Sequence, residues 1–195
     1  MQPGLHAVEA AGVRDLLPCA EPAGVEFLRG RASQVFEAFT VFLDTLFGQG
    51  VDAGVEKADL DLLFAPLLAL CAAPGLLAAL GQETLNDFVH QVAYRLMKAN
   101  EEKLALEAAG QRQRLEREAF VVKSLNSLLL RAIDFAEPNA LFTALFFVVF
   151  LARERPGEDS AGLATLAFKV LARMVKNFRR TIEQIDGRVL LGLLQ

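Results

Sequence analysis

The chain has 195 residues, 53% of them hydrophobic, which is enough for one domain with its own core. Its formal net charge of -4 argues against generic nucleic-acid binding, which usually leaves a basic excess. Phenylalanine is abundant at 15 residues, tryptophan is absent and tyrosine occurs once, a profile that suits a dry helical core better than a polar cleft.

The first half of the chain begins loosely and then shows amphipathic helices. Residues 1–28 are interrupted by proline and glycine and are expected to be a lead-in or linker. A helix is predicted over 29–47, where phenylalanine, valine and leucine recur at spacings of three and four. A second helix is predicted over 57–73, with Pro66 expected to kink or break it. A third is predicted over 82–99.

Residues 98–118 change character, because they are charged, mixed in sign and interrupted by Gly110. Two interpretations stay open for this charged connector: a polar linker, or a solvated helical extension. The alternative that it is a partner-binding arm is less favoured, since charge runs usually mark a solvated face.

The second half is predicted to hold four helices. The first spans 115–136, and the second, 138–153, is apolar nearly all round, so it should be the central helix of this half. The third, 162–178, is amphipathic, with Val175 expected on its apolar side. A final piece covers 181–194.

No stretch of the sequence alternates with period two, so the fold class is all-α. The helix starts recur every 23–33 residues or so, and pairs of such helices are somewhat longer than the ~40-residue period of HEAT-type arrays. We therefore expect an α-solenoid of stacked antiparallel helix pairs forming one domain over 29–195. Clear sequence self-similarity between repeats is not seen.

The sequence offers little that would support catalysis or metal binding. Cys19 and Cys71 lie far apart, and His6 and His90 have no partner at ligand spacing. No phosphate-binding, dinucleotide-binding, zinc-protease or serine-hydrolase motif occurs. We therefore expect no enzyme, no cofactor and no metal site. No signal peptide is visible and the longest apolar run is too short to span a bilayer, so a cytosolic or nuclear protein is expected.

One group of basic residues is a candidate binding site. Lys169, Arg173, Lys176 and Arg180 are spaced four, three and four apart, which places them on one helical face, and Arg179 adjoins them. A solvated face is the simpler explanation of this basic strip. The functional alternative is a docking strip for an acidic helix or for acidic protein tails.

Residues 120–194 also contain a series of short sequence motifs in a fixed order. They are, along the chain, 123–129 (KSLNSLL), 144–145 (AL), 169–171 (KVL), 173–175 (RMV), 181–182 (TI) with Ile185, and 188–191 (RVLL). This stretch resembles the C-terminal domain of the TOG-domain microtubule polymerase family, named for the tumour overexpressed gene product. The first half of the chain fits the family more weakly.

The resemblance implies a small, degenerate TOG-like domain of HEAT-type helical repeats in a microtubule-associated protein of the cytoplasm and cytoskeleton. In that family the upstream TOG domains contact tubulin through an edge with a tryptophan and basic residues. The C-terminal domain acts as an adaptor that helps recruit the protein to centrosomes, the spindle or microtubule ends through partners such as transforming acidic coiled-coil proteins. The absence of tryptophan here fits the adaptor role.

Three alternatives remain. The basic strip could bind tubulin or the microtubule lattice directly, through acidic tubulin tails. The chain could instead be a helical bundle that binds a partner helix in an apolar groove or perturbs membranes. It could also be a structural component of a cytoskeletal assembly. Nucleic-acid and membrane partners are not expected.

Overall fold

The computed structural model describes residues 28–48, 57–154, 157, 159–176 and 187–193. These residues contain helices and no strand, which confirms the expected all-α class for this part of the chain. The elements are α3 (Ala32–Gly48), α4 (Lys57–Ala72), the 3-10 helix η2 (Leu77–Ala79), α5 (Gln82–Ala108), α6 (Arg112–Phe135), α7 (Pro138–Glu154), α8 (Ser160–Lys176) and α10 (Gly187–Leu193).

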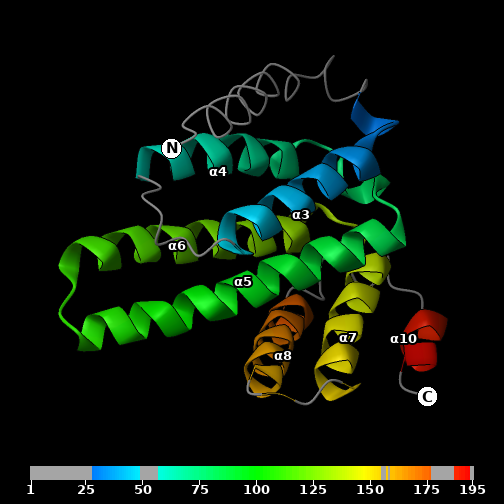
Figure 1. Cartoon of the computed structure of the whole chain (residues 1–195). Coiled ribbons are helices and arrows are strands. Elements are labelled where there is room, and N and C mark those ends of the chain that lie inside the picture. Colours follow the sequence, from blue (N-terminus) through cyan, green and yellow to red (C-terminus); the bar gives the residue numbers. More distant parts are fainter. Residues whose placement is uncertain (1–27, 49–56, 155–156, 158, 177–186, 194–195) are drawn as a thin grey trace.

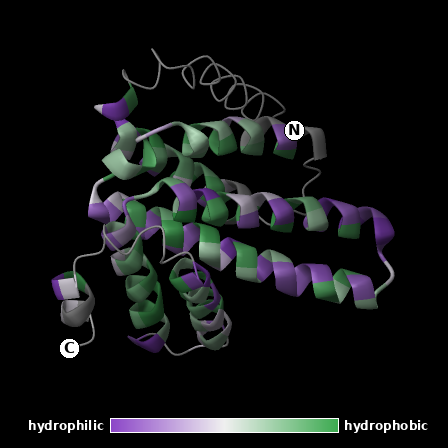
Figure 2. Cartoon of the chain, turned by 180° about the vertical axis from the view of Figure 1, so that it is seen from behind, coloured by the Kyte–Doolittle hydropathy of each residue, from purple (hydrophilic) through white to green (hydrophobic). Residues whose placement is uncertain are grey.

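A long hairpin of α5 and α6 forms the middle of the molecule (Figure 1). Its turn depends on Gly110, which has a positive φ of 68°. The N–H groups of Gly110 and Gln111 bond back to the carbonyls of Glu107 and Leu106, a glycine C-cap that satisfies the end of α5. Residues 98–118 are therefore a helical extension, and hydrophilic residues gather at its free end (Figure 2).

The other helices cover two sides of this hairpin. On one side α3 packs on α5 and α4 packs on α6, and on the other side α7 and α8 pack on α5 (Figure 1). Both α8 and α10 pack on α7, which lies between them. The contacts of α7 with α5, α8 and α10 confirm its expected central place in this half, while Phe150 near its end is 56% exposed.

Edge-to-face aromatic pairs join the helices across the core. The rings of Phe36 on α3 and Phe88 on α5 have centroids 5.1 Å apart, and both side chains are fully buried. Phe64 on α4 and Phe120 on α6 make a second pair at 6.2 Å. Such pairs add specific geometry to the burial of large apolar surfaces. The phenylalanine-rich composition therefore serves inter-helix packing.

Pro66, where a kink or a break was expected, does not break α4. The helix runs from Lys57 to Ala72, and the Pro66 ring is buried. Proline removes one backbone hydrogen bond from a helix. Burial of Leu60, Leu67 and other residues on the same helix offsets that loss, because tertiary packing supplies most helical stability in proteins.

Glu137 caps the start of α7. Its carboxylate accepts hydrogen bonds from the backbone N–H groups of Asn139, at 3.1 Å, and Ala140, at 2.6 Å. Pro138 occupies the first helical position, where its missing N–H leaves no bond unmade. Among the helices that the structure describes, none is both long enough and apolar enough to cross a membrane.

Candidate functional site

The basic strip predicted from the sequence lies on α8 and faces outward. Lys169, Arg173 and Lys176 are all exposed. Within the described ranges none of the three forms an ion pair, and α8 itself contains no acidic residue. The helix therefore presents three positive charges to solvent. Arg179 and Arg180, the other two residues predicted for the strip, lie outside the described residues.

The opposite side of α8 attaches the helix to α5 and α7. Near its start, Gly162 approaches Met97 of α5 so closely that a Cβ at position 162 would lie 2.8 Å from the Met97 Sδ. The buried apolar residues of α8 are Leu163, Ala167, Leu171 and Met174. This packing on α5 and α7 determines which side of α8 faces solvent.

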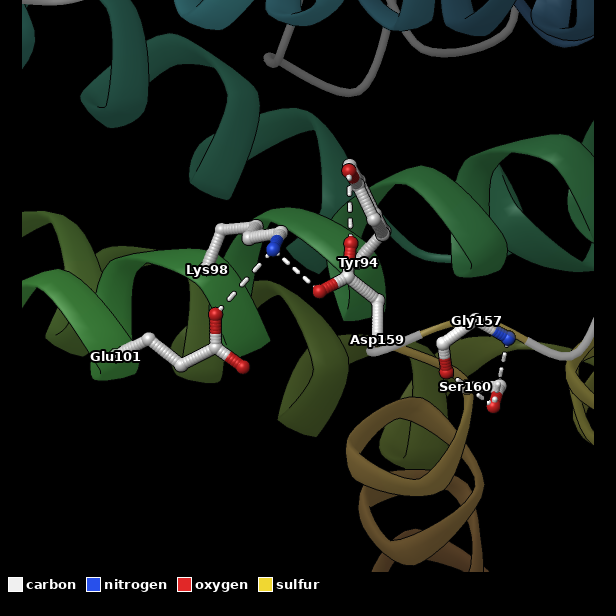
Figure 3. Close-up of polar contacts among 6 residues, drawn as sticks. All are labelled: Tyr94, Lys98, Glu101, Gly157, Asp159 and Ser160. Atoms are coloured by element: carbon white, nitrogen blue, oxygen red, sulfur yellow. Dashed lines mark hydrogen bonds and ion pairs between the residues drawn. The ribbon is translucent and has the colours of Figure 1, made fainter.

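A polar cluster ties the start of α8 to the middle of α5 (Figure 3). Lys98 and Tyr94 lie one turn apart on α5, and both reach Asp159, the residue before α8. The Lys98 ammonium forms an ion pair with one carboxylate oxygen of Asp159, and the Tyr94 hydroxyl donates to the other at 3.5 Å. Glu101 also accepts a hydrogen bond from Lys98, at 3.3 Å.

The cluster also acts on the charge of Lys98. Its hydrogen bond to Asp159 is the main cause that raises the Lys98 pKa, and Glu101 adds to the effect while burial opposes it. The ion pair therefore favours the protonated form of Lys98, the form that a lysine already has at neutral pH. At the same loop, the Ser160 hydroxyl donates to the Gly157 carbonyl at 2.7 Å (Figure 3). These bonds fix where α8 begins.

The outward side of α8 also carries apolar side chains that were not expected there. Val175 was expected on the buried side of its helix, but it is 53% exposed, and Phe168 is 56% exposed. The error has a physical reason: apolar residues occupy a wider part of the circumference of α8 than the contact with α5 and α7 can cover. No signal in the local sequence could have placed Val175 beside the basic strip, because its exposure depends on how much of α8 the neighbouring helices cover.

A hollow of about 250 Å³ lies where α3, α5, the end of α7 and the start of α8 meet. Arg95 is one of its lining residues. Its guanidinium pairs with Asp44 at 2.5 Å and lies 5.9 Å from the ring centroid of Phe47 and 5.4 Å from that of Tyr94. These contacts join α3 to α5 at the hollow. Among the described residues, the Arg95 Nε and the Oε1 of Gln91, which also lines the hollow, are buried without a hydrogen-bond partner.

The side chains that commonly bind metals are not brought together in the described part of the chain. No group of three or more His, Cys, Asp or Glu side chains is placed there to hold a metal ion. His90 stacks on Tyr94 with ring centroids 6.4 Å apart, and Cys71 is buried. His6 and Cys19 lie outside the described residues.

Comparison with known proteins adds no identification. No family model, no curated protein and no solved structure matches the chain. The resemblance of residues 120–194 to the C-terminal TOG-like domain therefore remains a hypothesis, and α8 is the part of the molecule on which it can be tested.

Proposed function

We propose that this chain is a non-catalytic adaptor domain of a microtubule-associated protein of the TOG polymerase family. In this proposal it recruits the protein to centrosomes, the spindle or microtubule ends by binding an acidic coiled-coil protein of the transforming acidic coiled-coil type. The supporting observation is the outward basic side of α8, formed by Lys169, Arg173 and Lys176 on a helix without acidic residues. Such a surface attracts and orients a partner of opposite charge.

The arrangement of the helices supports the finer fold proposal, a small degenerate TOG-like domain of HEAT-type helix pairs. Short connections join α5 to α6 and α7 to α8, and the members of each pair pack on each other. α3 packs on α5 and α4 packs on α6, whereas α3 and α4 make little contact with each other, so within the described residues the support for helix pairs comes from α5–α6 and α7–α8. Helix pairs that contact mainly their neighbours are the unit of helical-repeat proteins.

Charge reversal on α8 tests the function. The variant Arg173→Glu with Lys176→Glu should weaken retention of a purified acidic coiled-coil protein by about tenfold or more, because two attractive contacts become repulsive. Both residues lie in the last turn of α8, where cations favour the helix dipole. Each reversal there costs about 0.3–1 kcal/mol, so circular dichroism must show that the fold persists.

The matched control carries the same charge change on another helix. Arg112 and Lys123 are exposed on α6, so Arg112→Glu with Lys123→Glu alters the net charge equally and leaves α8 intact. This control should bind as the original chain does. Equal binding by the α8 variant and the control variant would show that the basic side of α8 is only a solvated face.

Direct binding to tubulin is the second candidate, because acidic tubulin tails would be attracted to the same three cations. Co-sedimentation with microtubules at low and high salt distinguishes the two, since salt screens contacts between exposed charges. Strong salt-sensitive co-sedimentation, lost when the tubulin tails are removed by protease, favours tubulin. Retention of the acidic coiled-coil protein without co-sedimentation favours the adaptor.

A further inference from the structure

The exposed side of α8 carries a row of residues with the spacing of a coiled-coil seam. Ala161, Thr165, Phe168, Ala172 and Val175 follow one another at intervals of four, three, four and three. All five are exposed, and the two largest, Phe168 and Val175, are 56% and 53% accessible. Intervals that alternate between three and four residues keep a row in line along a helix and let it pack along a second helix.

The sizes and charges around this row suit a partner helix. The small residues of the row leave room between the two large ones, which is how side chains of one helix fit between those of another. Lys169 and Lys176 stand directly after Phe168 and Val175, at the flank of the row that remains in solvent. Arg173 lies further round the helix. The other flank, which includes Ala164 and Leu171, turns toward the core.

We propose that α8 docks an acidic amphipathic helix of a partner protein by coiled-coil packing along Ala161, Thr165, Phe168, Ala172 and Val175, with Lys169 and Lys176 pairing to carboxylates beside the partner's apolar seam. This proposal rests on the proposed function and specifies how its partner binds. Residues that flank a seam determine which helices pair, because opposite charges attract and like charges repel across it.

Charge distinguishes this occupant from a second copy of the chain. A symmetric antiparallel pairing of two α8 helices would bring the two basic flanks face to face, so Lys169 and Lys176 would meet like charges. No acidic residue of α8 could compensate them. An acidic helix meets the same flanks with opposite charge, and the chain is therefore expected to stay a monomer through this face.

The test uses three synthetic peptides and the full chain. The first has about four heptads with leucine in the seam and glutamate at both flanks, a length that helices need to be stable in water. The second has the same composition in scrambled order, and the third has lysine at the flanks. If α8 docks a helix along this row, the first peptide should bind the full chain at least about tenfold more tightly than either of the others, as measured by fluorescence anisotropy. Equal binding by the first two peptides would overturn the seam.

Matched variants locate the binding face. Phe168→Glu should weaken binding of the acidic heptad peptide by about tenfold or more, since it removes an apolar contact and adds a like charge. Leu104→Glu is the control, because Leu104 is 65% exposed on α5 and receives the same substitution away from α8. Among single reversals, Lys169→Glu and Lys176→Glu should each weaken binding more than Arg173→Glu. Equal losses for all three would indicate a diffuse basic surface and overturn the seam.

Failure of this inference differs from failure of the proposed function. If retention of the acidic coiled-coil protein is lost with the Arg173 and Lys176 reversals but unchanged in Phe168→Glu, the adaptor function stands and the seam is wrong. If the acidic coiled-coil protein is not retained at all, the function is wrong, and the peptide series still judges the seam. A dimer in solution, or Phe168-dependent binding to anionic phospholipid vesicles without peptide binding, would assign the face to those occupants.

Discussion

Gly162→Ala probes the close approach of α8 to α5, which determines how α8 is seated. A Cβ at position 162 would lie 2.8 Å from Sδ and 3.3 Å from Cγ of Met97. Non-bonded atoms are relaxed at about 3.5–4.0 Å, so the Met97 thioether must move by roughly 1 Å. Met97 is only 6% exposed, and the neighbouring core leaves it little space. The added methyl group therefore has to displace either Met97 or α8.

Two opposing terms determine the size of the effect. Alanine is favoured over glycine inside a helix by about 1 kcal/mol. Overpacking a filled core costs about 1–3 kcal/mol, and the flexible Met97 side chain keeps this cost from the upper end. We therefore expect Gly162→Ala to lower the free energy of unfolding by about 1 kcal/mol, from the difference of these terms.

Urea unfolding followed by circular dichroism measures this effect in two backgrounds. With Met97→Ala in place the obstacle is gone, so Gly162→Ala should stabilise the protein by up to about 1 kcal/mol. Gly192→Ala in α10 is the control, because nothing lies within 4 Å of its Cβ position, and it should not destabilise. If Gly162→Ala changes the free energy of unfolding in the same direction in both backgrounds, Met97 is not the obstacle at position 162.

Two further predictions concern buried titratable groups. Burial, with nearby Glu102 adding to it, raises the pKa of Glu118, while the hydrogen bond from Arg117 lowers it. A carboxyl whose pKa is raised by folding contributes most stability below its unfolded pKa and loses that contribution as pH rises through the folded pKa. The free energy of unfolding of Glu118→Gln, minus that of the original chain, should therefore increase between about pH 4 and about pH 7, the range that begins near the ordinary glutamate pKa. Chemical denaturation at several pH values measures this difference, and a difference that does not change with pH would contradict the prediction. Burial likewise raises the pKa of the Cys71 thiol. In a Cys19→Ser background, Cys71 should react with a disulfide reagent about a thousandfold more slowly in the folded protein than in denaturant, whereas fast labelling in buffer would contradict its burial.

The helices themselves could be predicted because their apolar residues recur at helical intervals. The start of α7 was accurate for a local reason, since Pro138 suits only the first turn of a helix. The end of α5 was less predictable. Residues 100–108 have few buried side chains to mark them as helical, and only the Gly110 turn shows where α5 ends. The contact between α5 and α6 keeps this polar stretch helical.

The environment of the candidate site could not be predicted, because it depends on residues far apart in sequence. Asp159 and Lys98 are separated by 61 positions, and nothing in their local sequences indicates an ion pair. The outward direction of Lys169 followed from helical spacing alone. The exposure of Val175 did not, because it depends on how far α7 reaches around α8, which is a property of the packed helices.

The apolar row and the basic flank of α8 have different roles in the proposed docking. Phe168 and Val175 are about half exposed, so covering either one would contribute roughly 1 kcal/mol, about half the value of a fully transferred side chain. Exposed ion pairs contribute less, about 0.2–1 kcal/mol each, and salt screens them. Most affinity should therefore come from the row, whose loss speeds dissociation, and the lysines should act on association and on the choice of partner. A surface with only the lysines would attract any acidic segment, and the row beside them restricts it to a helix.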